Sequence, residues 1–280
     1  MPADLRTNTA TGRVDPVWTT IRSEAERLAK DEPLMASMVH AVVLNHRSLE
    51  DALSYRIAEK LASPEMPALL IREICEMSYA DRPQIGVAAR ADVIAVRERD
   101  PFCDRMVQPL MFFKGFLGIQ AYRVGHWLWT TGRKDMAMYF QMRISELFSM
   151  DINPAARIGQ GIMIDHAHAI VIGETAVVGN DVSMLHSVTL GGTGKEGGDR
   201  HPKIGDGVLI GAGAKVLGNI RIGECSRVAA GSVVLKDVPP CKTVAGIPAR
   251  IVGEAGCDRP SYSMNQVLTD PDPEDILPDC

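Results

Sequence analysis

The second half of this sequence has almost no aromatic residues. Of the 14 aromatic side chains in the 280-residue chain, 13 precede residue 150 and only Tyr262 follows it, whereas 19 of the 25 glycines lie after residue 150. Aromatic rings bury large areas and dominate many protein cores. Their scarcity implies that the second half encloses a narrow interior lined by aliphatic side chains, and that the two halves fold differently.

Other features are missing as well, and each absence excludes a class of protein. No apolar run approaches the roughly 18 residues of a transmembrane helix, and the first residues lack the apolar core of a signal peptide. The net charge is −5 and no dense run of Lys and Arg occurs, which argues against a nucleic-acid partner. The six cysteines form no Cys-x-x-Cys pair, as is typical of reduced thiols. We therefore expect a two-domain cytoplasmic protein with no membrane or nucleic-acid partner.

Residues 1–150 have the pattern of packed helices. An apolar stretch from residue 112 to 131 ends at Gly132, and glycine is favoured just past a helix C-terminus. A further helix is predicted from about residue 135 to 148. Ser63 and Asp100 each precede a proline, a pattern that predicts a helix start because proline is favoured at the first helical position.

A six-residue period begins after residue 150. A helix repeats at 3.6 residues and a half-buried strand at two, whereas a period of six with small residues is the signature of a parallel β-helix. Three hexapeptides, or about 18 residues, then complete one triangular coil whose Ile and Val side chains stack inward. The repeating positions are Ile152, Ile158, Ile164, Ile170, Ala176, Val182 and Val188, followed by Ile204, Ile210, Val216, Ile222, Val228 and Val234.

The period is interrupted once. The gap from Val188 to Ile204 is 16 residues, one period plus ten, so we expect a loop that projects from the coils at about residues 194–203. Long loops on rigid scaffolds tend to carry function. The predicted fold is of the α+β class, with three parts: an all-helical oligomerisation domain (1–150), a left-handed parallel β-helix catalytic domain (151–253), and an irregular, flexible C-terminal tail (254–280).

Three short segments hold side chains suited to catalysis. Asp165 and His166 lie on the third hexapeptide, Asp151 lies at the domain junction, and Arg200 and His201 end the projecting loop. Transfer of an acyl group to a hydroxyl needs a base for the hydroxyl proton and stabilisation of the oxyanion. A His oriented by a carboxylate is a suitable base near neutral pH.

Several segments resemble serine O-acetyltransferases, the first enzymes of bacterial cysteine synthesis. The hexapeptide repeats alone indicate only a broad acyltransferase superfamily. The helical half, together with the Gly-Gly-Asp-Arg-His loop, indicates serine as the acceptor, and the resemblance runs from about residue 17 to 253. The segments are 52–55, 63–67, 99–101 and 120–129 in the helical half, and 151–156, 161–167, 188–195, 197–204, 210–215 and 244–250 in the coils.

The resemblance implies transfer of an acetyl group from acetyl-CoA to L-serine, inhibition by L-cysteine, and no metal requirement. It implies that His166 is the general base and that Asp151 orients it, and that serine is bound by Asp100, Asp165, Arg200 and His201. In the family the cleft lies between neighbouring subunits of a trimer, and trimers pair into a hexamer. Acetyl-CoA lies along the later coils, where the expected contacts are Gly192, Ala212, Ala230, Lys236 and Arg250.

Two features depart from the family pattern. His168 and His186 stand where relatives have small or neutral polar residues. Their spacing of 18 residues predicts that they stack on adjacent coils with side chains within about 5 Å. Family tails often end in Ile, which inserts into the active site of cysteine synthase, whereas this chain ends in Cys280. That difference argues against a complex with cysteine synthase.

Three other interpretations remain open from the sequence alone. Hexapeptide acyltransferases also act on other hydroxyl or amine acceptors, such as sugars. A structural subunit that only docks cysteine synthase is a second alternative, against which the intact Asp151 and His166 argue. A γ-type carbonic anhydrase is the third, because it shares the β-helix and binds zinc through three histidines. Its ligands would come from His166, His168, His186 and His201.

Overall fold

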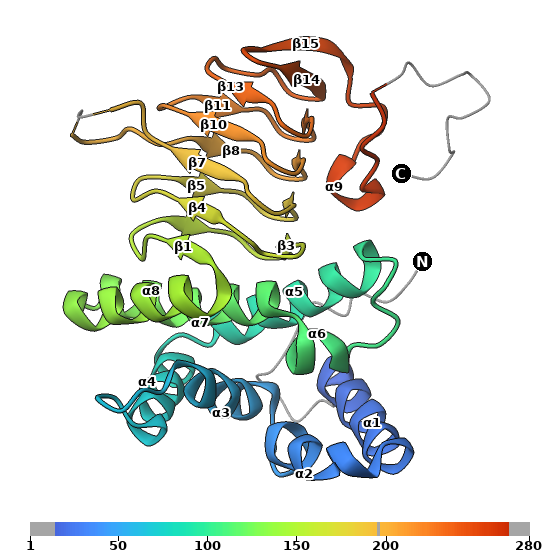
Figure 1. The fold of residues 1–280 in the computed structure, drawn as a ribbon, viewed down its shortest axis with the longest axis vertical. Coiled ribbons are helices and arrows are strands. Elements are labelled where there is room, and N and C mark those ends of the chain that lie inside the picture. Colours follow the sequence, from blue (N-terminus) through green and yellow to red (C-terminus); the bar gives the residue numbers. More distant parts are fainter. Residues whose placement is uncertain (1–14, 195–196, 269–280) are drawn as a thin grey trace.

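Helices form the first half of the chain and short strands form the second (Figure 1). The computed structural model describes residues 15–194 and 197–268. The helical elements of the first half are α1 (Pro16–Asp31), η1 (Pro33–Met35), α2 (Ala36–Val39), η2 (His40–Leu44), α3 (Leu49–Leu61), α4 (Ala68–Asp81), α5 (Gln84–Arg99), α6 (Val107–Phe112), α7 (Lys114–Thr130) and α8 (Lys134–Phe148). The strands are β1 (Met150–Ile152), β2 (Arg157–Ile158), β3 (Met163–Ile164), β4 (Ile170–Ile172), β5 (Val177–Val178), β6 (Ser183–Met184), β7 (Thr189–Gly191), β8 (Lys203–Ile204), β9 (Leu209–Ile210), β10 (Lys215–Leu217), β11 (Arg221–Ile222), β12 (Arg227–Val228), β13 (Val233–Val234), β14 (Lys242–Gly246) and β15 (Ala249–Glu254).

The strands stack into three sheets that form the three faces of a β-helix. The first face has the order β1-β4-β7-β10-β13, the second β11-β8-β5-β2, and the third β15-β14-β12-β9-β6-β3. Up to β13, each face takes every third strand along the chain, so three strands complete one coil. Neighbouring strands are parallel except β14 and β15, which close the stack as an antiparallel hairpin. The predicted fold class, a helical domain followed by a parallel β-helix, is confirmed.

The coil interior is aliphatic, as the scarcity of aromatic residues predicts. On the first face, equivalent positions of five successive strands point inward, and none is more than 2% exposed. Branched aliphatic side chains suit this pleated, buried surface. The residues in this column are Ile152, Ile172, Leu190, Val216 and Val234.

The number of residues per coil differs from the prediction. Met150 pairs with Ile170, so the first coil has 20 residues, whereas Val171 pairs with Thr189 at the expected spacing of 18. Thr189 in turn pairs with Lys215, at a spacing of 26. The prediction of one unbroken register followed by a ten-residue insertion is therefore wrong. The ten extra residues are divided into two and eight.

The two extra residues widen the turn between β3 and β4, and the other eight lie in the loop between β7 and β8. That loop projects from the stack of coils (Figure 1). In the widened turn, three residues that carry a Cβ have positive φ, which is uncommon and strained. Strain of this kind concentrates at functional sites. These residues are His166 (57°), Ala167 (53°) and Ala169 (53°).

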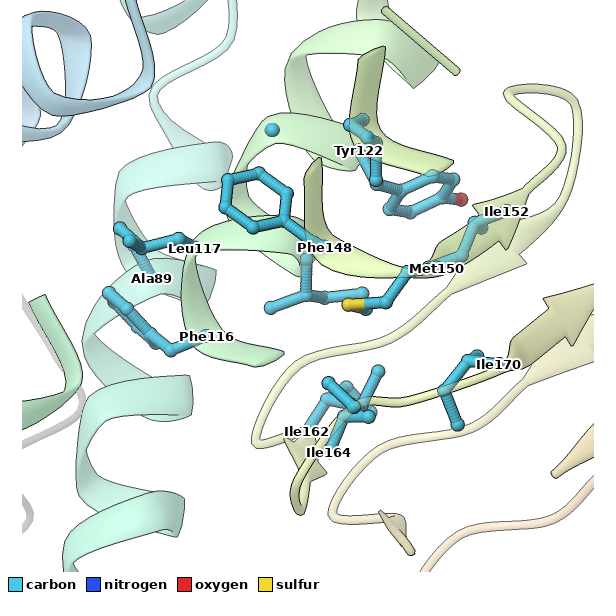
Figure 2. Packing of buried hydrophobic residues seen from close by; sticks show 14 of the residues in the cluster. Ala89, Phe116, Leu117, Tyr122, Phe148, Met150, Ile152, Ile162, Ile164 and Ile170 are labelled. Carbon is cyan, nitrogen blue, oxygen red and sulfur yellow. The ribbon is translucent and has the colours of Figure 1, made fainter. Parts of the chain in front are cut away.

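The helices and the coils share one continuous hydrophobic core. Aromatic side chains of α7 and α8, among them Phe116, Tyr122 and Phe148, belong to the same buried cluster as Met150 and Ile164 of the first coil (Figure 2). The Tyr122 hydroxyl also donates a hydrogen bond to a backbone carbonyl of that coil. The helical half therefore packs directly against the first coil and supports it.

The start of α7 approaches the first coil so closely that glycine is required. A Cβ added to Gly115 would lie 2.1 Å from the carbonyl oxygen of Ile164, and one added to Gly118 would lie 2.5 Å from the sulfur of Met150. Backbone atoms such as the Ile164 carbonyl cannot move aside cheaply. Gly115 thus lets the start of α7 lie beside β3, and Gly118 lets the same helix lie beside β1.

Both proline-based helix starts are wrong. Ser63 lies in a turn, and α4 begins only at Ala68. Asp100 ends α5 instead of starting a helix, and its carboxylate accepts a hydrogen bond from the amide of Phe102 (2.9 Å). Side chains such as Asp compete in this way with helical hydrogen bonds. The two later predicted helices are confirmed as α7 and α8.

The segment predicted as a tail contains the helical turn α9 (Pro260–Ser263), which contacts α5 and β9. The Ser183 hydroxyl donates to the carbonyl of Ser261 (2.8 Å), and the guanidinium of Arg99 lies 3.9 Å from the centre of the Tyr262 ring. The end of the chain, on which the argument about cysteine synthase depends, lies outside the described residues.

Candidate active site

A cavity of about 590 Å³ lies where the helices meet the first coil. Its walls come from the end of α5, the start of α7 and the turn after β3. Much of the wall is apolar, including Phe112, Phe113 and Met163. A few polar groups converging in an apolar hollow are typical of a small-molecule site. The ionisable residues of the wall are Asp100, Lys114, Asp165 and His166.

His166, the predicted base, lies on the strained turn between β3 and β4. Its Nε2 lies 3.3 Å from a carboxylate oxygen of Asp165, and its side chain is 65% exposed. A general base must come within hydrogen-bond reach of the proton that it removes. An accessible imidazole beside a carboxylate, at the edge of a cavity, meets that requirement.

His168 and His186 do not occupy equivalent positions. The 20-residue first coil places His166 opposite His186, and the two ring centres are 5.6 Å apart with an angle of 60° between the planes. His168 instead accepts a hydrogen bond at Nδ1 from the ammonium of Lys114 (3.0 Å). The predicted register that would stack His168 on His186 is wrong, because the intervening turn holds two more residues than assumed.

One corner of the β-helix carries both the predicted base and two predicted coenzyme contacts. This corner joins the third face to the first. The register of β3, β6, β9 and β12 aligns the turns that follow these strands on four successive coils. We call the four aligned residues the corner ladder: His166, His186, Ala212 and Ala230.

Arg200 and His201 are fixed at a different corner, where the projecting loop returns to β8. The hydroxyl of Thr175 accepts hydrogen bonds from both backbone amides (3.0 and 3.1 Å), and Glu174 pairs with the Arg200 guanidinium (2.7 Å). A Cβ on Gly173 would lie 2.1 Å from the His201 ring, so glycine makes room for it. Burial, and then the charge of Arg200, lower the pKa of His201, which favours a neutral imidazole.

The single chain does not bring all predicted site residues together. Asp151 lies on the outward side of β1, where its carboxylate accepts a hydrogen bond from Gln141 (2.7 Å), and it does not line the cavity that holds His166. Arg200 and His201 do not line that cavity either. The other predicted coenzyme contacts are Gly192, beside His201, and Lys236 and Arg250, both exposed in the last coils.

Lys114 is the one ionisable residue of the cavity wall that the sequence did not single out. Lys114 is the lone charged residue between positions 110 and 119, and burial lowers the pKa of its ammonium group. A single charge inside an apolar run was the available signal. That signal does not show by itself that Lys114 faces the cavity. The close approach of α7 to the first coil at Gly115 places Lys114 beside the widened turn.

The four histidines considered as zinc ligands do not converge. His166 and His186 lie together, but His168 bonds to Lys114 and His201 lies at another corner. Among residues 15–194 and 197–268, no three His, Cys, Asp or Glu side chains are grouped so that they could hold a metal ion. Within these described ranges, no helix is long and apolar enough to cross a membrane.

The fold and the site define a hexapeptide-repeat acyltransferase, a β-helix that carries an accessible histidine beside a carboxylate. Two family models match the chain in agreement with this class. Residues 17–121 match the N-terminal region of serine acetyltransferases, and residues 201–236 match the bacterial transferase hexapeptide with six repeats. The match over the helical half therefore distinguishes serine acetyltransferases from other hexapeptide-repeat acyltransferases.

Known serine acetyltransferases are similar to this chain over most of its length. The enzyme of Escherichia coli (strain K12) is 57% identical over 250 residues, which cover 89% of this chain and 92% of that protein. A solved serine acetyltransferase in complex with cysteine has a TM-score of 0.88 at 53% identity, covering 90% of this chain and 98% of the other. The Brucella abortus strain S19 enzyme in complex with coenzyme A has a TM-score of 0.85 at 53% identity, covering 87% and 98%. The chain belongs to the serine acetyltransferase family.

Proposed function

We propose that this chain transfers the acetyl group of acetyl-CoA to the hydroxyl of L-serine, giving O-acetyl-L-serine and CoA in the first step of cysteine synthesis. The observation that carries the proposal is the convergence of Asp100, Asp165 and His166 on one cavity in a member of this family. These groups offer a base for a hydroxyl and carboxylates for an ammonium. Serine carries both.

Serine suits this arrangement because its ammonium and hydroxyl groups are on adjacent carbons. Asp165 and Asp100 bind the ammonium, and the hydroxyl lies at Nε2 of His166. This nitrogen is 3.3 Å from a carboxylate oxygen of Asp165, so both groups of one serine can be reached together. His166 takes the hydroxyl proton as the serine oxygen bonds to the thioester carbon, and the carbonyl oxygen becomes negative. When the intermediate collapses, the carbon–sulfur bond breaks and His166 gives its proton to the sulfur of CoA.

Acetyl-CoA is proposed to lie along the corner ladder. Ala212 and Ala230 have small side chains there, so the pantetheine arm can approach the backbone closely. Gly192 serves the same purpose near the loop, and the exposed Lys236 and Arg250 are suited to bind phosphates. The solved relative that contains coenzyme A supports acetyl-CoA as the co-substrate.

The remaining serine contacts are proposed to come from a second copy of the chain. Arg200 and His201 lie between the first and second faces of the β-helix, whereas His166 lies between the third and first. In a cyclic trimer, one copy's loop can face its neighbour's widened turn. Arg200 then binds the serine carboxylate through two parallel hydrogen bonds, and Asp151 orients His166. Trimers pair into a hexamer through the helical domain.

L-Cysteine is proposed to inhibit the enzyme from the serine site. Cysteine differs from serine only by sulfur in place of oxygen, so Arg200 and the carboxylates bind both amino acids. The solved relative in complex with cysteine supports this role. The inhibition is therefore competitive with serine.

A thiol-release assay tests the proposal. Purified protein is supplied with acetyl-CoA and with L-serine, a sugar acceptor or an amine acceptor, each with and without L-cysteine. We expect CoA release with L-serine alone, suppressed by cysteine in competition with serine. Faster release with the sugar or the amine would support the alternative acyltransferase activity. No release with any acceptor would contradict both.

A further inference from the structure

The corner that joins the second face of the β-helix to the third holds none of the candidate site residues. Each turn at this corner has one residue with a positive φ, a conformation that favours glycine. In the last two turns that residue is a cysteine, whose Cβ makes the conformation strained. The residues at this position, in chain order, are Gly161 (70°), Asp181 (56°), Gly207 (69°), Cys225 (53°) and Cys241 (57°).

Cys225 and Cys241 are aligned on neighbouring turns. The isolated bridge before them and the pairing of β12 with β14 after them both join residues 16 positions apart, which is also the separation of the two cysteines. The Cys241 amide donates a hydrogen bond to the carbonyl of Glu224 (2.9 Å). A Cβ added to Gly223 would lie 2.3 Å from the nitrogen of Pro240, so the backbones of the two turns are in close contact.

This alignment brings the two thiols within reach of a disulfide bond. Neighbouring strands are roughly 4.8 Å apart, and disulfides join Cα atoms that are about 4.4–6.8 Å apart. Both cysteines are free thiols in this structure. The other described cysteines lie elsewhere: Cys75 and Cys103 are buried in the helical half, and Cys257 follows β15 and donates to the hydroxyl of Ser263 (3.4 Å).

The two thiols differ in their surroundings. Cys241 is exposed, whereas Cys225 is half-buried. Burial, and then the neighbouring Cys241, raise the pKa of the Cys225 thiol, so Cys225 ionises less readily. The thiolate is the reactive form of cysteine, and an accessible one is oxidised first. Cys241 is therefore suited to react with an oxidant, and Cys225 to react with the product.

We propose that Cys225 and Cys241 form a site of reversible oxidation, at which a peroxide converts the two thiols into a disulfide. The Cys241 thiolate attacks one oxygen of hydrogen peroxide, the oxygen–oxygen bond breaks, and a sulfenic acid and water result. The Cys225 sulfur then bonds to the Cys241 sulfur as the sulfur–oxygen bond breaks, and the oxygen leaves with the Cys225 proton as a second water. The two thiols lose two hydrogens and two electrons, and a small thiol can reverse the reaction.

The bond would close the segment 225–241, which contains β12 and β13 and two of the predicted coenzyme contacts, Ala230 and Lys236. It would also join the last full coil to the hairpin of β14 and β15. A cross-link restricts the unfolded chain and so stabilises the folded one. We therefore expect the oxidised protein to melt several degrees above the reduced protein.

Peptide mapping of the whole chain tests the proposal without relying on turnover. Reduced protein is treated with hydrogen peroxide, its remaining thiols are alkylated, and it is digested with trypsin. We expect a link between the peptides 222–227 and 237–242, which each contain one of the two cysteines, and its loss when dithiothreitol is added before alkylation. Cys225→Ser and Cys241→Ser should each abolish the link and the rise in melting temperature. Cys257→Ser is the matched control and should retain both.

The variants also test the order of the two steps. With Cys225→Ser, the sulfenic acid on Cys241 has no partner and should be trapped by dimedone. A link from either cysteine to Cys257 or Cys280, or between two copies of the chain, would overturn the proposal. So would two thiols that remain alkylated after peroxide treatment, or an oxidised protein that melts no higher than the reduced one.

Discussion

The two groups of candidate site residues are held in place by different means. His166 lies on a widened turn with strained backbone angles, and its side chain is 65% exposed. Arg200 and His201 lie at the base of the projecting loop, where the hydroxyl of Thr175 binds both amides and only 7% of His201 is exposed. The first group depends on backbone geometry and on the packing of α7. The second depends on hydrogen bonds to a side chain.

Each group is preorganised, yet neither is a complete site. The predicted base and Asp165 lie at one corner of the β-helix, beside Asp100 at the end of α5, and Arg200 and His201 lie at another corner. A site shared between subunits needs one group of residues from each copy of the chain. A cyclic assembly repeats the same contact at every interface, so two complementary groups at different corners of one chain can form such a site. The predictions below separate the roles of the two corners.

The largest expected effect follows the loss of the base. His166→Ala should lower kcat by at least about a hundredfold, as expected for removal of a general base. The fold should persist because the side chain is largely exposed. Thiol release and a thermal melt of the same preparation measure the two quantities. Turnover within a few-fold of wild type would show that His166 is not the base.

A mixing experiment extends this test to the subunit interface. His166→Ala and Arg200→Ala chains are co-expressed in equal amounts and assayed at a serine concentration well below the wild-type KM, at which each variant alone is nearly inactive. If each site combines one copy's turn with its neighbour's loop, about a quarter of the sites contain both intact residues, and activity should return to that level. A mixture as inactive as its components would place both residues in one chain's site. A monomeric mass by light scattering would contradict the shared site directly.

The loss of Arg200 should have the next largest effect. Hydrogen bonds to charged groups contribute about 1.5–3 kcal/mol, so Arg200→Ala should weaken serine binding by roughly 10- to 100-fold. Cysteine inhibition should weaken by a similar factor, because both amino acids offer the same carboxylate. Kinetics at varied serine and cysteine measure both constants. Cysteine inhibition that survives unchanged while serine binding is lost would place the inhibitor site elsewhere.

The coil register shows why part of the fold escaped the sequence. Alternate residues of a strand point to the same side, so Ile170 and Ile172 of β4 are both buried inside the coil. Ile170 lies six residues after Ile164, but the structural equivalent of Ile164 in the next strand is Ile172. Counting by six therefore moved from the inward positions equivalent to Ile172 to those equivalent to Ile170. The two inserted residues could not be recognised, because both sets of positions are buried and aliphatic. The Ile and Val period predicts a β-helix but does not locate a two-residue insertion.

The site was predicted in part for a similar reason. Asp100, Asp165 and His166 line one cavity, and their roles stay predictions. Asp165 and His166 could be placed from the sequence because they lie in a short motif on a repeating scaffold. The bond from Lys114 to His168 joins residues 54 positions apart and depends on how closely a helix approaches a coil. The packing of Gly115 against the first coil fixes how close Lys114 comes to His168.

A smaller effect is expected when the hydrogen bonds at the second corner are removed. Thr175→Val keeps the shape of the side chain but leaves the amides of Arg200 and His201 without their acceptor. We expect the KM for serine to rise by roughly three- to tenfold, with a smaller change in kcat, because a loosened loop costs binding orientation. Thr175→Ser keeps the hydroxyl and is the matched control. Equal behaviour of the two variants would show that the hydroxyl does not position the loop.

The smallest expected effect concerns stability at mildly acidic pH. Burial, and then the nearby charge of Arg82, lower the pKa of His126, which donates from Nδ1 to the carbonyl of Pro154 (2.8 Å). The unfolded chain therefore binds this proton more readily than the folded chain. The stabilising contribution is complete above the unfolded pKa of about 6.5 and is lost as the pH falls below it. His126→Asn keeps a donor near Nδ1 but does not titrate, so its melting temperature should fall less than that of wild type between pH 7 and pH 5. Parallel pH profiles for the two proteins would show that His126 does not contribute to acid sensitivity.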